Sequence, residues 1–97
     1  MTDVTRRDLI NAIIGYVKDA DIESFKENPH KLCEYFEEIV HSCECTSFKE
    51  EDLALLNAII KDAKGAIAIC KSDSPNQAAF IDYRERIMSN ANCLKGR

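Results

Sequence analysis

The scarcity of glycine and proline limits what this chain can fold into. Its 97 residues contain three glycines and two prolines. A β-rich domain needs a tight turn roughly every 8–12 residues, and glycine and proline supply many of those turns, so their scarcity argues against strands. With 45% apolar and 31% charged residues, the chain is typical of one compact domain spanning residues 1–97. An all-α fold is therefore expected.

Four segments combine a helix start signal with apolar residues at helical spacing. A hydroxyl or amide side chain before the first turn and a proline at the first helical position are both typical of helix N-termini. These patterns predict helices over residues 5–20, 29–43, 47–71 and 74–95. Short polar connections between them predict a compact bundle of about four helices with antiparallel neighbours. The connector 21–27 has room for one helical turn.

The predicted caps are side chains that can accept a hydrogen bond from a first-turn amide. They are Thr5, then Asn28, which precedes Pro29, then Ser47, and finally Ser74. Gly96 is expected to terminate the last helix.

The helix predicted over residues 47–71 is expected to be longer than the two predicted helices before it and to lie at the centre of the bundle. Its main apolar seam is Leu53, Leu56, Ile60, Ala63, Ile67 and Cys70, and its second apolar edge is Leu55, Ile59, Ala66 and Ile69. Ile60, in the middle of the main seam, is expected to be fully buried. Because exposed apolar patches often mark an interface, a helix that is apolar on two sides also predicts a homodimer.

Two glycines fall inside predicted helices, where glycine costs about 1 kcal/mol relative to alanine. Gly15 is expected to compensate by allowing the close approach of another helix. Gly65 is expected to mark either a close helix crossing or a bend.

Cysteine usage and hydropathy predict the compartment. The five cysteines are an odd number, which is unusual for a secreted disulfide scaffold. The N-terminal residues do not resemble a signal peptide, and the longest apolar run, residues 66–70, is far shorter than the ~20 residues of a membrane span. We therefore expect a cytoplasmic protein with free thiols and no membrane partner.

The net charge of −4 is distributed unevenly along the chain. Residues 1–20 carry no net charge, residues 21–62 carry −7 and residues 63–97 carry +3. The acids at 50–52 are expected in the first turn of a helix, where they favour the helix dipole. The remaining acids form either a solvated face or a surface that docks a basic protein. The basic tail is thin and lacks interleaved aromatic side chains, so nucleic acid is not an expected partner.

The candidate partner-binding residues share the outer face of the helix predicted over residues 29–43. They are Glu34, Glu37, Glu38, His41 and Glu44. Spacings of three or four residues place side chains on one face of a helix. The residues of this helix expected to point inward are Leu32, Phe36, Ile39 and Cys43.

An alternative site is a metal centre formed by His30, Cys33, His41, Cys43 and Cys45. A structural zinc site needs four such ligands converging on one point. No C-x-x-C pair is present, and the chain around Cys43 and Cys45 would have to leave helical geometry before both sulfurs could bind one ion. Buried cysteines also serve as small hydrophobic residues.

No arrangement typical of catalysis is recognisable. Neither histidine stands in an activating context with a serine or cysteine, and the chain has no glycine-rich phosphate loop. We expect no enzyme activity and no cofactor. The expected function is that of a small acidic interaction module that binds and modulates another protein, of the inhibitor, immunity-protein or chaperone type. The alternative is a small metal-binding helical protein.

Overall fold

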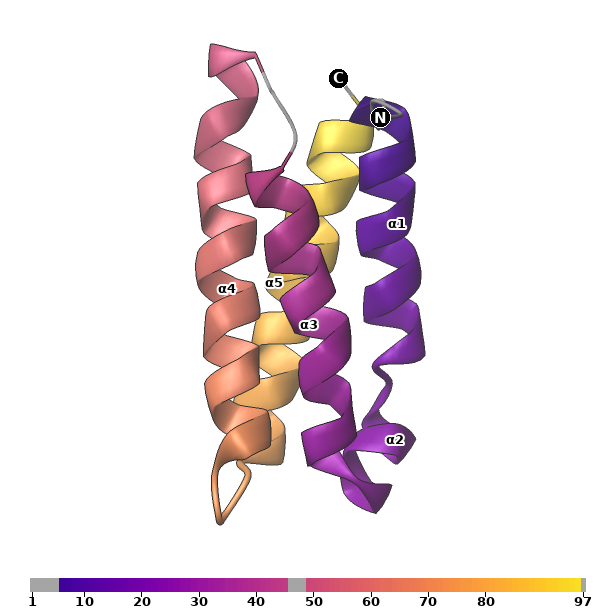
Figure 1. Cartoon of the computed structure of the whole chain (residues 1–97), viewed down its shortest axis with the longest axis vertical. Helices are drawn as coiled ribbons and strands as arrows, with labels where there is room; N and C mark the ends of the chain where they lie inside the picture. The colour runs from indigo at the N-terminus through magenta and orange to yellow at the C-terminus, as the bar shows by residue number, and fades with distance from the viewer. Residues whose placement is uncertain (1–5, 46–48, 97) are drawn as a thin grey trace.

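The computed structural model describes residues 6–45 and 49–96. They form the helices α1 (Arg6–Asp19), α2 (Ile22–Glu27), α3 (Pro29–Glu44), α4 (Leu53–Lys71) and α5 (Gln77–Lys95), with a 3-10 turn, η1 (Glu50–Asp52), before α4. The four long helices run alternately down and up the long axis of the molecule (Figure 1). Each contacts two antiparallel neighbours, in the order α1, α3, α4, α5 and back to α1. This confirms the predicted all-α bundle and adds the short helix α2.

The boundary between α2 and α3 differs from the prediction in its capping. The Asn28 side chain makes no capping bond to α3. Its backbone N–H instead donates to the Ser24 carbonyl oxygen at 2.9 Å, which ends α2. Pro29 then begins α3 at the first helical position, as predicted.

The start of α5 also differs from the prediction. The helix begins at Gln77, and its cap is Asn76, whose Oδ1 accepts a hydrogen bond from the Ala79 N–H at 3.1 Å. Ser74 lies outside the helix, so the prediction of a serine cap is wrong. Gly96 follows the last helical residue, as predicted. The predicted caps at Thr5 and Ser47 lie outside the described residues.

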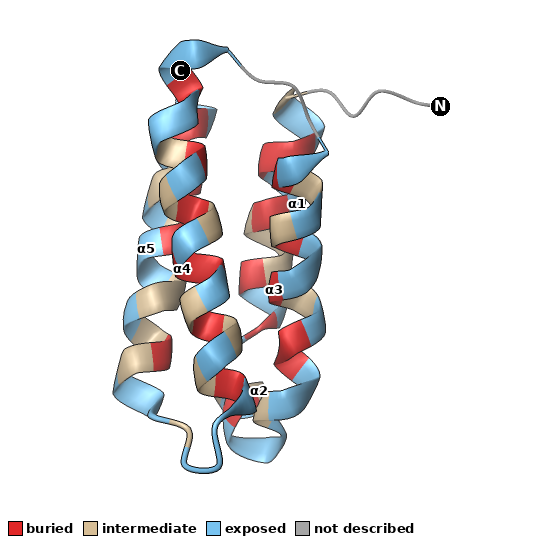
Figure 2. Ribbon diagram, turned by 60° about the vertical axis from the view of Figure 1, so that its left-hand side comes forward, coloured by how far each residue is buried: buried red, intermediate tan, exposed pale blue. Residues whose placement is uncertain are grey.

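The buried residues of the four long helices lie on the sides of the helices that face one another (Figure 2). The buried residues of α3 are Leu32, Cys33, Phe36, Ile39 and Cys43, which include all four predicted to point inward. Phe25 of α2 stacks on Phe80 of α5 with ring centroids 4.2 Å apart. Phe36 of α3 meets the same ring edge-on at 5.9 Å. The short helix α2 thus covers one end of the core.

The inward face of α4 is rotated from the predicted one. Ile59 is fully buried, whereas Ile60 is only partly buried and Leu53 is 44% exposed. The buried residues are Leu56, Ile59, Asp62, Ala63, Ala66 and Cys70. The prediction for Ile60 is therefore wrong. Apolar residues occupy both edges of α4, and packing against α3 and α5 buries some of them more completely than others. At 19 residues, α4 is no longer than α5.

Gly65 marks a close helix crossing. A Cβ atom at this position would lie 2.6 Å from two ring carbons of Tyr83 on α5. Gly15 shows no such crowding, because no atom of the described residues lies within 4 Å of the position its Cβ would take. The predicted close approach at Gly15 is therefore wrong.

Two arginines connect the ends of helices. Arg6 donates from Nε to Asp52 at 2.8 Å and from Nη2 to the Leu94 carbonyl oxygen at 2.7 Å, joining α1 to η1 and α5. Arg84 of α5 donates from Nε to the carbonyl oxygens of Val17 and Ala20 at 3.1 and 3.0 Å, near the C-terminus of α1. These bonds satisfy carbonyl groups that a helix end leaves without an internal partner.

The bundle covers most of the apolar surface on which the homodimer prediction depends. Among the described large hydrophobic side chains, Leu53 alone is exposed. Several others are only partly buried, among them Leu55, Ile60, Ile67 and Ile69 of α4. The oligomeric state itself stays a prediction.

Candidate functional site

The candidate site is the outward side of α3, and its position follows from the apolar residues on the opposite side of the helix. Burial of Leu32, Phe36 and Ile39 fixes the rotation of α3 in the bundle. All five predicted partner-binding residues are exposed as a result: Glu34, Glu37, Glu38, His41 and Glu44. We refer to these five residues as the α3 face.

The α3 face carries four carboxylates with little internal compensation. Glu37 forms an ion pair with Lys71 of α4, with Nζ 3.6 Å from Oε1. Both side chains are more than half exposed, and such pairs contribute little to stability. No cation of the described residues pairs with Glu34, Glu38 or Glu44. The face is therefore a solvated surface of mostly negative charge, and Lys31 is exposed one turn before Glu34 on the same helix.

The neighbouring helix carries the opposite charge. The exposed charged residues of α4 are Lys61, Lys64 and Lys71. The one acid of α4, Asp62, is buried and lies 3.7 Å from Arg86 of α5. The α3 face is thus bounded on the α4 side by Lys71. Sequence counting assigned the whole of residues 21–62 to one acidic region and did not resolve this boundary.

His41 and Cys45 are the only pair among the proposed metal ligands for which the structure shows a contact between the described residues. The Cys45 sulfur lies 3.6 Å from Nε2 and 3.9 Å from Nδ1 of His41, one helical turn away. Both side chains are exposed. Two ligands on a surface fall short of the four that a structural zinc site requires.

The other members of the proposed metal cluster lie apart from this pair. His30 is exposed in the first turn of α3, while the Cys33 thiol donates to the Ile67 carbonyl oxygen of α4 at 3.9 Å. Cys43 is buried, and burial raises the pKa of its thiol to about 11, so the metal-binding thiolate is disfavoured. The described residues contain no group of three or more metal-ligating side chains. The predicted five-residue cluster is therefore not assembled.

Two depressions lie in the surface formed by the described residues. One of about 560 Å3 is lined by α5 alone, through Arg84, Glu85, Met88, Ser89, Asn92 and Cys93. A second, of about 400 Å3, lies beside the Arg6–Asp52 pair and is also lined by Lys49 and Glu51. Neither lining places a histidine next to a nucleophile, which general base catalysis by this residue would need.

Two pairings that join separate elements were not found from the sequence. Arg6 with Asp52 and Cys33 with Cys70 both combine residues far apart in the chain. The sequence offered one signal for the second pairing: Cys33 and Cys70 each lie on the apolar side of a predicted helix. Helical spacing within one segment does not reveal which residues of another segment lie opposite.

Comparison with protein families, curated proteins and solved structures finds no match to this chain. None of the helices in the described ranges has the length and apolar content needed to cross a lipid bilayer.

Proposed function

We propose that this protein is a small non-enzymatic interaction module that binds another protein through the α3 face. The observation that carries the proposal is the exposure of four carboxylates on one side of one helix, three of them without an ion-pair partner among the described residues. A surface of one charge sign speeds association with a partner of opposite sign and helps to select that partner. The partner is expected to have a basic surface.

The charge of the α3 face does not serve folding. Glu34 and Glu38 are four residues apart, and like charges at this spacing on a helix repel by about 0.2–0.5 kcal/mol. The exposed surface of α5, by contrast, mixes the two signs, as with Asp82 and Arg86, which pair at 2.9 Å. Association with a cationic partner explains the unmixed charge of the α3 face, whereas stability does not.

The lysines of α4 add specificity to this surface. A uniformly basic partner that covered both helices would meet Lys61 and Lys64 as well as the carboxylates. Such a partner would be disfavoured, because like charges brought together at an interface are costly. The best fit is a narrow basic element, such as one cationic helix, lying along α3.

The experiment is affinity capture from an extract of the native host with three forms of the protein. They are the wild type, the double variant Glu34→Lys with Glu38→Lys, and a control, Asp73→Lys with Glu85→Lys. The control residues are exposed and lie outside α3. Both variants raise the net charge from −4 to zero, so they differ in position alone.

The proposal predicts a basic protein that the wild type and the control retain in similar amounts and that the α3 variant loses. Equal recovery of every captured protein with all three forms would contradict it. Circular dichroism of the three forms confirms that each keeps the same helical content. The proposed compartment is the cytoplasm, where the five thiols would stay reduced.

A homodimer is a second proposal, and the complementary charges of α3 and α4 favour it. A two-fold axis parallel to the helices would place the acidic α3 of one copy opposite the lysines of α4 in the other. Light scattering should then give twice the 11.0 kDa of one chain. The Glu34→Lys, Glu38→Lys form and a Lys61→Glu, Lys64→Glu form should each be monomeric alone and associate when mixed. A wild type that stays monomeric at high concentration would reject the dimer and leave the first proposal standing.

A further inference from the structure

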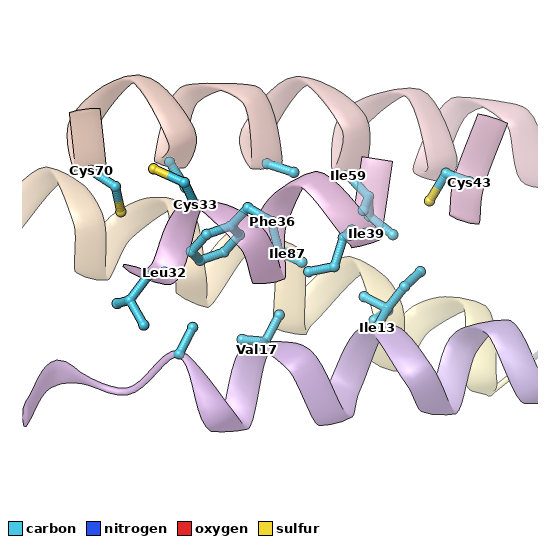
Figure 3. Close-up of a cluster of buried hydrophobic side chains, with 14 of the residues drawn as sticks. Ile13, Val17, Leu32, Cys33, Phe36, Ile39, Cys43, Ile59, Cys70 and Ile87 are labelled. Atoms are coloured by element: carbon cyan, nitrogen blue, oxygen red, sulfur yellow. The ribbon is translucent and has the colours of Figure 1, made fainter. Parts of the chain in front are cut away.

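Two buried cysteines meet between α3 and α4. Cys33 lies in the second turn of α3 and Cys70 in the last turn of α4, and the antiparallel arrangement brings these turns together. Cys33 is 6% exposed and Cys70 is completely buried. In Figure 3 the two sulfur atoms lie side by side, while Cys43 lies at the far end of α3.

The two thiols interact and are not equivalent. Burial raises the pKa of both. Nearby Lys71 and the side-chain hydrogen bond with Cys70 oppose that increase at Cys33, whereas charge on Cys33 and the same bond help raise the pKa of Cys70 to about 12. Cys33 is also the one of the two thiols that reaches solvent.

We propose that Cys33 and Cys70 form an oxidant-sensitive pair that closes to a disulfide between α3 and α4 on exposure to a hydroperoxide. The proposal rests on the contact of the two sulfurs across neighbouring helices and on the access of solvent to one of them. It is independent of the α3 face and its partner.

The chemistry takes two steps and consumes one molecule of hydrogen peroxide. The Cys33 thiolate attacks one peroxide oxygen, the O–O bond breaks, and the departing hydroxide takes up a proton to form water. Cys33 is now a sulfenic acid. The Cys70 sulfur then attacks the Cys33 sulfur, the S–S bond forms, and the hydroxyl group leaves with the Cys70 proton as a second water. The two thiols lose two electrons and two protons, and the peroxide is reduced to two waters.

The remaining cysteines do not offer an equivalent pair. Cys45 and Cys93 are exposed on the surface, where oxidation would join separate molecules. Cys43 is buried at the opposite end of α3 from Cys33. A double variant, Cys45→Ala with Cys93→Ala, therefore removes the competing exposed thiols and should leave the buried pair unchanged.

The test treats this double variant, fully reduced, with hydrogen peroxide and then maps its cysteines without reduction. The chain should lose about 2 Da, the mass of two hydrogen atoms, and a peptide containing Cys33 should be linked to one containing Cys70. Because the bond closes a loop of roughly 37 residues, the melting temperature should rise by about 10 °C and return on treatment with dithiothreitol.

A third substitution, Cys70→Ala, separates the two steps. The sulfenic acid at Cys33 should then persist and be trapped by dimedone, and no cross-link should form. If this variant does not fold, Cys33→Ala provides the same test through loss of the cross-link. Free Cys33 and Cys70 after peroxide treatment of the double variant would overturn the proposal. A cross-linked form that melts at a lower temperature than the reduced form would overturn it too, because the bond would then require distortion of the bundle.

Discussion

At the scale of single residues, a few polar side chains connect the ends of different helices. Asp52 is 2% exposed, and its carboxylate accepts bonds from Nε and Nη2 of Arg6 at 2.8 and 3.3 Å. A planar guanidinium matches a carboxylate in this two-point geometry. The same Arg6 reaches the Leu94 carbonyl oxygen, so one side chain connects the start of the chain to its end.

Replacing Asp52 with asparagine should destabilise the protein. The substitution keeps the shape of the side chain but removes its charge, and hydrogen bonds to charged groups contribute about 1.5–3 kcal/mol. We expect the free energy of unfolding in urea to fall by about 2 kcal/mol. Glu50→Gln, at an exposed position two residues away, is the control and should change it by less than about 0.5 kcal/mol. Equal effects of the two substitutions would mean that Asp52 is not buried against Arg6.

The two helical glycines should respond to alanine in opposite directions. Gly15→Ala adds a methyl group where the described residues leave space, so it should stabilise the protein by about 0.5–1 kcal/mol through the helix propensity of alanine. Gly65→Ala drives a methyl group against the Tyr83 ring, over which the Arg86 guanidinium lies at 5.1 Å. Overpacking of this kind costs about 1–3 kcal/mol.

The melting temperatures of the two glycine variants, measured by thermal unfolding, test these two predictions. A higher melting temperature for Gly15→Ala and a lower one for Gly65→Ala agree with the structure. Stabilisation by both substitutions would show that α4 and α5 are farther apart at this crossing than described here.

At the scale of helices, rotation about the helix axis decides which side chains enter the core. In α3 the apolar residues form one narrow stripe, so the sequence specifies the rotation, and both the buried side and the exposed α3 face were predicted correctly. In α4 the apolar residues cover two edges, so two rotations satisfy the same pattern. The contacts with α3 and α5 choose between them, and no pattern within α4 contains that information.

The adjacent residues Ile59 and Ile60 test the rotation of α4 directly. Ile59→Ala should cost about 2–5 kcal/mol, because it removes a fully buried side chain and leaves a cavity. Ile60→Ala should cost less than about 2 kcal/mol, because Ile60 is only partly buried. Urea unfolding of both variants measures the difference. A larger loss at Ile60 would restore the seam predicted from sequence and contradict the packing described here.

Helix ends were predicted less well than helix interiors, for a related reason. Several capping side chains compete within a few residues, as Ser74 and Asn76 do before α5, and local sequence does not rank them. The connection of Arg6 to Asp52 and the contact of Cys33 with Cys70 depend on which helices become neighbours. Such pairings follow from the assembled bundle rather than from the spacing in any one segment.

At the scale of the whole molecule, the bundle converts a charge imbalance along the chain into opposed charges on adjacent helices. The α3 face is acidic, and the exposed charged residues of α4 are basic. Counting charges along the sequence located the acidic residues. It did not predict the boundary between the acidic α3 face and the basic surface of α4, because the burial of Asp62 beside Arg86 could not be read from a charge count. A partner approaching α3 therefore meets a strip of negative charge with a positive border.

This border gives the lysines of α4 an expected effect of their own. Lys61→Gln with Lys64→Gln removes two positive charges beside the α3 face, so association with a basic partner should become faster at low ionic strength. Stopped-flow or surface-based kinetics would measure the change. A slower association would place the lysines inside the binding surface instead of at its edge.

The central claim is that the α3 face guides a basic protein to this molecule. Its most direct test is the association rate constant with the captured partner, measured at low and at physiological ionic strength. We expect the wild type and the Asp73→Lys, Glu85→Lys control to associate quickly and to slow as salt is added. Glu34→Lys with Glu38→Lys should slow association by about tenfold or more at low salt and remove most of the salt dependence. Equal rate constants for all three forms at both salt concentrations would contradict the claim.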